Sequence, residues 1–548
     1  MPTPLAAYTQ PLTAQTAAHL LRRSTFGPTQ AEITAFIGLT AQQAVGQLVS
    51  NVNYTTPPPI DLNETKTTFR QPYLSLPFDQ DRNYELGQYV LYGWLAQMTS
   101  QTAPASLLEK LALFWQNHFV ITRTVVGDYR FLFQYIQLIR TNALGNFRTL
   151  VTKMTKEPAM LVYLNGDQNQ VGNPNENYGR ELQELFVVGA VDFEGNKNYT
   201  EDDVKTVAKV LTGWGHTHHN ETDSTSFTTT FTDSLHDATN KTFTDHYNNT
   251  VITGRAVSNP GTSSAGDAEL TDLVNMLVQH PNCPKYICRK LYRWYVNSNI
   301  TADIETNVIT PLASFFASPA NDFAIQPVIE KLLMSQVFFD SVNIGAVVKS
   351  PAELILGAMR FFNQPVPDRV TDSVAFRKYF EFVFYQMNDM QMGLVDQPSV
   401  LGYDACYQTG FSRLWINTSS IGLRGNLTDA YIWRWLEVKP GYNLGIDLIA
   451  WVTALQPNFT DVAGTPAITC ATVMASFSKN LFTIDLFQSQ TDFLIDTIMM
   501  QGVPRTDWLF EWNAYRRDIT NPGSQYSVLW RLQNLMRYML RMAEYHVC

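Results

Sequence analysis

The feature that most constrains this chain is the spacing of its apolar residues, which recur at intervals of three and four along most of the sequence. Clear examples run over residues 13–23 and 31–50, and the same spacing returns at 84–99. Residues three or four apart share one face of an α-helix, so this period is typical of amphipathic helices. The fold class is therefore predicted to be mainly α, with a large, multi-helix, bundle-like body.

The same spacing continues through most of the chain. It predicts helices over 106–119, 128–142, 146–163, 267–280, 284–296, 302–317, 323–336, 350–362 and 371–391, followed by a mostly helical C-terminal part. Another helix is expected to begin at Thr200, a hydroxyl N-cap followed by three acids, and to end near Gly213. With 45% hydrophobic residues among 548, the chain can bury a large core. Global disorder is excluded.

One region interrupts the helical pattern. Residues 215–256 are rich in Thr, Ser and Asp and show almost no aliphatic period. We predict a polar insertion with short strands over 215–266, lying on the helical body. No internal repeat and no clear linker divides the rest, so residues 1–548 are expected to form a single large helical domain.

Charge and missing motifs exclude several function classes. The net charge is −10 and no cluster of Lys and Arg stands out, which argues against nucleic acid as a partner. No apolar run approaches the roughly 18 residues that a membrane span needs. The first residues, MPTPLAAYTQ, lack the features of a signal peptide, so a cytoplasmic location is expected. Five scattered cysteines do not suggest a disulfide framework. The G-x-S-x-G, Walker, H-E-x-x-H and G-x-G-x-x-G motifs are absent.

The most polar helix-like stretch is NPNENYGRELQELFVVGA, residues 173–190. At about 100° per residue, an apolar side is formed by Tyr178, Leu182, Leu185 and Phe186. The opposite arc carries Glu176, Asn177, Arg180, Glu181, Gln183 and Glu184. In one interpretation this arc is a solvated face with ion pairs four residues apart. In the other, a second element covers it, and its carboxylates bind one ion or hold one proton donor.

Seven segments, in chain order, resemble a known family. They are HLLRRSTFGPT (19–29), FWQNHF (114–119), NPNENYGRELQELFVVG (173–189), YTEDDVKTVAKVLTGW (199–214), HD-x-x-x-K (His236, Asp237, Lys241), HPNCPKYICRKLYRWYV (280–296) and SPAELILGAMR (350–360). Together they are similar to the bacterial family catalogued as domain of unknown function 1800, from about residue 14 to the C-terminus. The chain departs from the family within 393–417, where one proline is lost and Tyr403 replaces a tryptophan.

The resemblance implies a large bacterial protein without an established activity. Members are often encoded beside a companion family, domain of unknown function 1501, which resembles sulfatases and alkaline phosphatases. Many members carry export signals. The companion protein is therefore a candidate partner.

The polar positions of the family-like segments suggest one site. We expect His118, the stretch 176–184 and the stretch 236–241 to converge in a shielded pocket. In this hypothesis Glu181 or Glu184 is a metal ligand or general base, and His118 is a second ligand or a proton shuttle. His236 completes the metal ligands, while Asn177, Arg180 and Lys241 bind the substrate. The reaction would be hydrolysis of an anionic or glycan-like substrate, assisted by a divalent metal.

The alternative hypothesis is a non-catalytic binding or assembly protein. There the acid–arginine network would be a structural lock between helices, and the partner would be the companion sulfatase-like protein. The sequence leaves both hypotheses open, together with the substrate, the metal and the oligomeric state.

Overall fold

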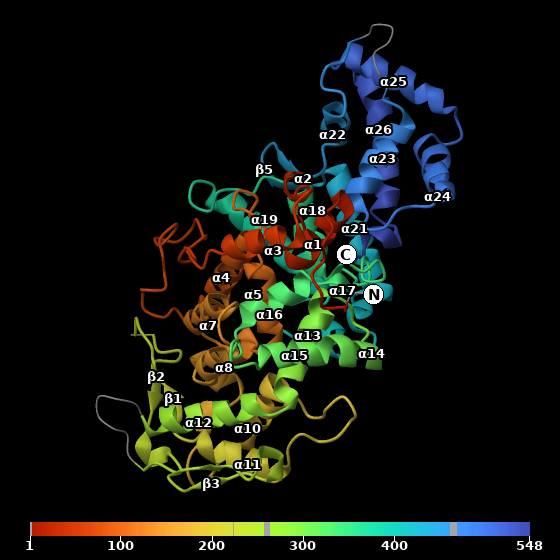
Figure 1. Cartoon of the computed structure of the whole chain (residues 1–548). Helices are drawn as coiled ribbons and strands as arrows, with labels where there is room; N and C mark the ends of the chain where they lie inside the picture. The colour runs from red at the N-terminus through yellow and green to blue at the C-terminus, as the bar shows by residue number, and fades with distance from the viewer. Residues whose placement is uncertain (1–2, 223, 257–263, 461–467) are drawn as a thin grey trace.

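The protein is built almost entirely of helices, as the sequence predicts (Figure 1). The structure is a computed structural model that describes residues 3–222, 224–256, 264–460 and 468–548. Residues 223 and 257–263 of the predicted polar insertion therefore lie outside the described residues.

The helices fall into three groups along the chain. The first is α1 (Ala14–Ser24), α2 (Gln30–Phe36), α3 (Ala41–Ser50), α4 (Asn83–Met98), α5 (Leu108–His118), α6 (Arg123–Val126), α7 (Tyr129–Asn142), α8 (Phe147–Thr155) and α9 (Pro158–Tyr163). The second is α10 (Glu176–Glu181), α11 (Glu201–Val210), α12 (Ala265–Gln279), α13 (Asn282–Tyr295), α14 (Ala302–Ile304), α15 (Thr310–Phe316), α16 (Ile325–Leu333), α17 (Gln336–Phe339), α18 (Pro351–Phe361) and α19 (Ser373–Asp389). The third is α20 (Asp404–Tyr407), α21 (Thr418–Trp433), α22 (Leu448–Ala454), α23 (Cys470–Leu481), α24 (Gln488–Phe493), α25 (Arg505–Arg517) and α26 (Pro522–Met539).

The arrangement in space places the central helices between two ends. In Figure 1, α10, α11 and α12 lie at one end of the molecule and α22 to α26 lie at the other. Helices α1, α5, α13 and α18 lie between them. None of the helices in the described ranges has both the length and the apolar character needed to cross a membrane.

Local signals explain most helix boundaries. Helix α11 begins after Thr200, whose side chain forms a capping box with Asp203, as predicted. The helix predicted over 31–50 is instead two helices, because the chain turns between α2 and α3 at Gly38, where φ is +85°. The helix predicted over 146–163 is also two helices. It is interrupted before Pro158, because proline disfavours helical backbone at the preceding residue.

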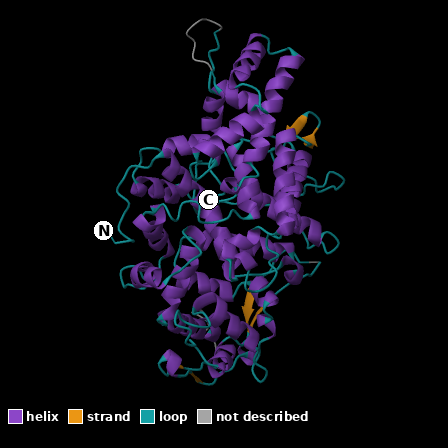
Figure 2. Cartoon of the chain, turned by 90° about the vertical axis from the view of Figure 1, so that its right-hand side faces the viewer, coloured by secondary structure: helices purple, strands orange, loops and turns teal. Residues whose placement is uncertain are grey.

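Short strands occur where the polar insertion was predicted. Strand β1 (Trp214–His216) pairs antiparallel with β2 (Thr229–Phe231), and β3 (Lys241–Thr242) pairs antiparallel with β4 (Val251–Ile252). A third hairpin, β5 (Leu436–Lys439) with β6 (Tyr442–Leu444), was missed. The hairpins are the orange arrows of Figure 2, and all else that is regular there is helical. The predicted mainly α fold with short-strand excursions is confirmed.

The core is continuous and contains charged groups. Buried apolar side chains form one cluster that runs from Leu12 to Tyr545. Three arginines, Arg23, Arg140 and Arg424, are at most 1% exposed. All five cysteines are free thiols, in agreement with the absence of a disulfide framework in the sequence. Arg140 is paired with Glu109 at 2.6 Å, whereas Arg23 and Arg424 donate to backbone carbonyl oxygens. Buried charges without acid partners are costly.

A contact between two glycines sets α18 against the end of α1. A Cβ atom on Gly357 of α18 would lie 2.9 Å from the carbonyl oxygen of Phe26, and one on Gly27 would lie 2.8 Å from the Cα of Gly357. Only glycine permits such a close approach of two backbones. The contact brings the N-terminal turn of α18 close to Arg23 on α1.

Candidate functional site

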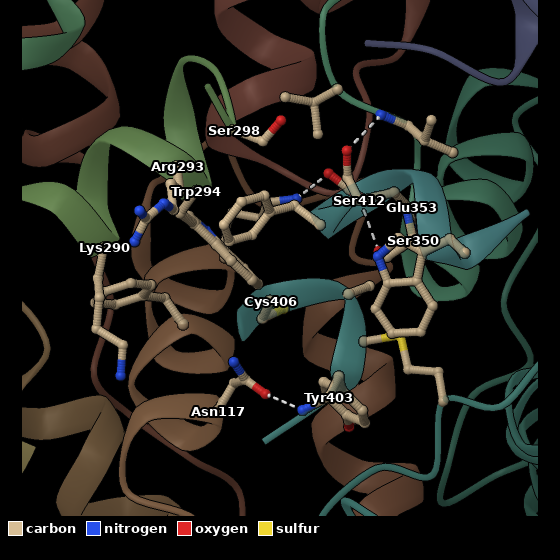
Figure 3. Close-up of a pocket in the computed structure, with 18 of the residues that line it drawn as sticks. Asn117, Lys290, Arg293, Trp294, Ser298, Ser350, Glu353, Tyr403, Cys406 and Ser412 are labelled. Carbon is tan, nitrogen blue, oxygen red and sulfur yellow. Dashed lines mark hydrogen bonds and ion pairs between the residues drawn. The ribbon is translucent and has the colours of Figure 1, made fainter. Parts of the chain in front are cut away.

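A cavity that is partly open to solvent lies among the central helices, and about 70 Å³ of it can hold the centre of a water molecule. Figure 3 shows Lys290, Arg293 and Trp294 on one side of it, and Tyr403, Cys406 and Ser412 on the other. The first group comes from α13 and the second from the segment around α20. The lining residues are Arg23, Lys110, Phe114, Asn117, His118, Lys290, Arg293, Trp294, Ser298, Val347, Val348, Ser350, Glu353, Met392, Tyr403, Ala405, Cys406, Phe411, Ser412 and Trp415.

His118, the last residue of α5, lies in the cavity wall with only 2% of its surface exposed. Its Nε2 is 2.8 Å from the carbonyl oxygen of Phe186, and its Nδ1 is 2.9 Å from Nζ of Lys290. A carbonyl oxygen only accepts, so Nε2 carries the proton and Nδ1 is the acceptor. Burial, and then the charge of Lys290, hold the pKa of this imidazole well below its usual value. Both nitrogens are engaged, which leaves neither free to bind a metal.

Lys290 and Arg293 stand one turn apart on α13 and both face the cavity. The only hydrogen bond of Lys290 within the described residues is the one to His118. Burial lowers the pKa of its ammonium group to about 7, and the nearby Arg293 adds to this lowering. Arg293 lies over the ring of Phe411, at 4.8 Å from the ring centroid. Its Nε is buried without a hydrogen-bond partner, and in the described chain it forms no ion pair.

The far wall holds the only carboxylate that lines the cavity within the described residues. Glu353 accepts a hydrogen bond from Lys110, and its Oε2 accepts from the backbone N and the hydroxyl of Ser350 at 2.7 Å each. Burial would raise the pKa of Glu353, but Lys110 and Arg23 lower it to about 2. This carboxylate is therefore ionised, and its charge is balanced by the adjacent Lys110. Arg23 donates instead to the carbonyl oxygens of Tyr295 and Trp294, at 3.0 and 2.5 Å.

The segment that departs from the family pattern supplies the remaining wall. Oδ1 of Asn117 accepts a hydrogen bond of 2.9 Å from the backbone N of Tyr403. The residue before it, Gly402, has φ of +100° and approaches Asn117 so closely that a Cβ would lie 2.5 Å from Oδ1. The hydroxyl of Tyr403 donates to the carbonyl oxygen of Gly393 at 2.7 Å. Tyr403 thus fixes the loop that carries Cys406 into the cavity.

The predicted residues of the polar stretch lie elsewhere, on α10 and the π-helical turn η2 (Leu182–Val187) that continues it. None of them lines the cavity. Arg180 forms a two-bond ion pair with Glu201 at 2.7 and 2.8 Å, in place of a pair within its own helix. Oε2 of Glu184 accepts from the Tyr199 hydroxyl at 2.6 Å. Asn177 is exposed and donates to the carbonyl oxygen of Leu164 at 3.3 Å.

Glu181 is the one carboxyl group of this stretch with a distinctive environment. It is half-buried on α10. Burial, and then repulsion from Glu184, raise its pKa to about 7, although Arg180 acts in the opposite direction. Among the described residues it has no hydrogen-bonding partner. The first interpretation of the stretch, a solvated face, therefore fits Asn177 and Arg180 better than it fits Glu181.

His236 and Lys241 form a third, separate group around Glu269 of α12. Lys241 Nζ is 2.6 Å from Oε2 of Glu269, and His236 Nε2 is 3.2 Å from Oε1. All three side chains are at most 1% exposed. Burial would raise the pKa of Glu269, but the adjacent His236 and Lys241 lower it. This group is a neutralised internal ion pair.

The structure does not gather the predicted metal ligands at one place. His118 bonds to Phe186 and Lys290, Glu184 bonds to Tyr199, and His236 lies beside Glu269. Within the residues that the structure describes, no group of three or more His, Cys, Asp or Glu side chains is placed to hold a metal ion. Three of the predicted ligands, His118, Glu184 and His236, are engaged by different neighbours, and Glu181 has no hydrogen-bonding partner among the described residues.

The sequence reasoning missed Lys290, Arg293, Lys110 and Glu353. Lys290 lies on a helix with other basic residues, for which acids would be the ordinary partners, but its observed partner is a histidine. The sequence did offer one indication of these residues: like His118, they lie in or beside the family-like segments. Spacing within one helix does not reveal which face another helix covers.

Comparison with known proteins supports the resemblance. The profile of the family described as "Protein of unknown function (DUF1800)" matches residues 19–546. The chain belongs to the DUF1800 family. No curated protein and no solved structure matches it significantly. Membership in DUF1800 supplies no activity, so the function must be argued from the geometry of the cavity.

Four of the seven family-like segments of this DUF1800 protein meet at the cavity. They contribute Arg23, His118, Arg293 and Glu353, from α1, α5, α13 and α18. The segments around 176–184 and 236–241, where the site was predicted, do not line it. Residues far apart in the chain are thus brought together at one place, but the set is largely different from the predicted one.

Proposed function

We propose that this protein binds a small organic anion in the cavity, with the negative group held by Arg293 and Lys290. The observation that carries the proposal is the pair of cationic side chains on α13 that face the cavity without an acid partner. A partly buried cation is costly unless it is paired. An anion bound there would supply the missing partner through charge-assisted hydrogen bonds.

The charge of the whole lining supports the same conclusion. Three cationic side chains, Arg23, Lys110 and Arg293, and the partly protonated amine of Lys290 face one carboxylate, Glu353. That carboxylate is already bonded to Lys110 and Ser350. The cavity therefore presents surplus positive charge inside a protein whose net charge is −10. A cavity with apolar walls strengthens the attraction for an anion, because water screens it less there.

The apolar walls indicate what the rest of the ligand is like. Phe114, Trp294, Met392 and Trp415 line the cavity between its polar groups. Sites for small molecules are typically apolar with a few convergent polar groups that fix orientation. A ligand with one anionic group and an apolar or aromatic body matches this pattern.

This proposal keeps part of the hypothesis drawn from the sequence. The proposal retains an anionic ligand. The described residues offer no set of ligands for a divalent metal that would assist hydrolysis. No feature of the cavity favours a glycan-like substrate. A non-catalytic role with the companion sulfatase-like protein stays a prediction.

The test is a ligand panel of one shape and different charge. Benzoate, phenyl phosphate and phenyl sulfate are compared with neutral benzyl alcohol by thermal shift and calorimetry. A ligand that binds only the folded state raises the melting temperature. We expect a shift with at least one anion and none with the alcohol. Arg293→Gln should weaken that binding by about 10-fold or more, since hydrogen bonds to charged groups contribute roughly 1.5–3 kcal/mol.

Lys285→Gln is the matched control. Lys285 lies on the same helix but does not line the cavity. It removes the same charge and should leave the affinity unchanged apart from a small long-range effect. The proposal is wrong if no anion of the panel binds, or if both variants weaken binding equally.

A further inference from the structure

Anion binding alone does not explain the surroundings of the Lys290 amine. Lys290 lines the cavity, and its Nζ contacts no carboxylate in the described chain and bonds to a neutral imidazole nitrogen. Lysines that serve only as charge anchors usually point at an acid or at solvent. A lysine amine that is desolvated beside another cation is instead the typical form of a nucleophilic lysine.

The bond to His118 fixes how the amine is held. His118 Nε2 donates to the carbonyl oxygen of Phe186, so Nδ1 must accept from Lys290. One N–H of Lys290 therefore points at the imidazole. The ring of Tyr286 lies on another side, with its centroid 5.1 Å from Nζ. In the neutral amine the lone pair and the second N–H remain for a molecule bound in the cavity.

The surroundings favour that neutral form. The titratable groups near Lys290 are Tyr286 and Arg293 on its own helix, His118 on α5 and Cys406 in α20. None of them is an ionised carboxylate, and burial together with Arg293 lowers the pKa of the amine to about 7. Near neutral pH a substantial fraction of Lys290 is therefore unprotonated.

We infer that Lys290 forms an imine with the carbonyl carbon of an oxo acid whose carboxylate is held by Arg293. The inference rests on the proposed function, because Arg293 is its anion-binding group. Arg293 follows Lys290 by one helical turn, so both reach the same side of the cavity. A short 2-oxo or aldehyde acid carries its carbonyl beside its carboxylate, which suits an amine and a guanidinium group one helical turn apart.

The step needs no other reactant. The lone pair of the neutral Nζ attacks the carbonyl carbon. The carbonyl oxygen takes up one proton from the nitrogen and one from solvent, and it leaves as water. Neutral amine, oxo acid and one proton thus give a protonated imine and one water. The protonated imine keeps one N–H, which can continue to donate to Nδ1 of His118. His118 is accordingly a positioning residue for the amine.

The test is reductive trapping on the full chain. Protein is incubated with glyoxylate and cyanoborohydride, and the modified lysines are located by peptide mass spectrometry. We expect Lys290 to be labelled at least about tenfold faster than Lys285 at pH 7, because more of its amine is neutral. Its rate should level off just above pH 7, while exposed lysines continue to gain rate up to about pH 10. Acetaldehyde, which lacks the carboxylate, should lose most of this preference.

Two variants separate the two proposals. Lys290→Arg retains the charge but has no nucleophilic amine, so it should still bind the anions of the panel and lose the trapped adduct. Arg293→Gln should slow trapping by glyoxylate but not by acetaldehyde. If anions bind and Lys290 is labelled no faster than Lys285, the imine is refuted and the anion site stands. If glyoxylate traps Lys290 but no anion binds reversibly, the assignment of Arg293 is wrong.

Discussion

Glu181 is a carboxyl group whose surroundings favour its neutral form. Burial and the neighbouring Glu184 raise its folded-state pKa to about 7, from an ordinary value near 4.5. Below pH 4.5 the group is protonated in both states and costs nothing. Between pH 4.5 and 7 the unfolded chain ionises first, so folding loses stability as pH rises, and the loss is complete above 7.

Glu181→Gln should therefore stabilise the protein at pH 8 and have little effect at pH 4.5. Glutamine is nearly isosteric and removes the charge that is unfavourable in the folded state. Melting temperatures of both proteins, measured by calorimetry at several pH values, check the difference between them. A difference that does not change with pH would show that the charge of Glu181 has no cost in the folded protein.

The sequence predicted individual residues least well, for a physical reason. His118 was singled out as part of a family-like segment, but its partner Lys290 is 172 residues away in the chain. Periodicity reports which residues share a helical face, and it carries no information about which distant helix covers that face. The roles of Glu181 and Glu184 as metal ligands depended on such a partner, and the neighbours present are Arg180 and Tyr199.

The close contact of Gly357 with Phe26 predicts that a larger residue at position 357 destabilises the protein. Alanine normally stabilises a helix relative to glycine by about 0.5–1 kcal/mol. At Gly357 the added Cβ would lie 2.9 Å from a backbone oxygen, which cannot swing aside. We expect Gly357→Ala to destabilise the protein by about 1–3 kcal/mol, as overpacking does. It should also weaken anion binding, since α18 carries Glu353 and, at its N-cap, Ser350.

Gly93→Ala provides the matched comparison for this prediction. Gly93 lies within α4, and a Cβ there would meet no atom within 4 Å. The same substitution should therefore be neutral or stabilising at position 93. Urea unfolding of the two variants measures the contrast. Equal effects at both positions would mean that α1 and α18 can separate without cost.

Helices were predictable as elements, and the exceptions are instructive. Capping and periodicity located α1, α11, α13 and α18 to within about two residues, because these signals are local. The helical-wheel prediction for residues 173–190 does not hold at η2, where the backbone is π-helical over Leu182–Val187. An angle of 100° per residue no longer applies there. The predicted alignment of Glu184 with Asn177 and Glu181 assumed a regular α-helix throughout.

At the scale of the whole molecule, the two ends of the chain are tied to its centre. Arg22 of α1 donates to the carbonyl oxygen of Asn480 in α23 at 2.7 Å. Asp429 of α21 accepts from Arg537 in α26 at 3.1 Å and from Arg541 at 2.7 Å. Buried apolar side chains continue across these links in one cluster. That residues 1–548 form a single domain stays a prediction.

A single domain should unfold as one cooperative unit, whereas a chain of this length usually divides into parts that unfold separately. We expect hydrogen exchange, followed by mass spectrometry along a urea series, to show α5 and α25 losing protection at the same urea concentration. Both helices bury tryptophans, Trp115 in α5 and Trp508 in α25, so each reports on a well-packed part of the core.

Removing the link with Asp429→Asn should lower both midpoints together. If α25 loses protection first in the unmodified protein, helices α22–α26 form a separate unit and the prediction of one domain is wrong. The anion site would then belong to the remaining part alone, because all of its described lining lies between Arg23 and Trp415.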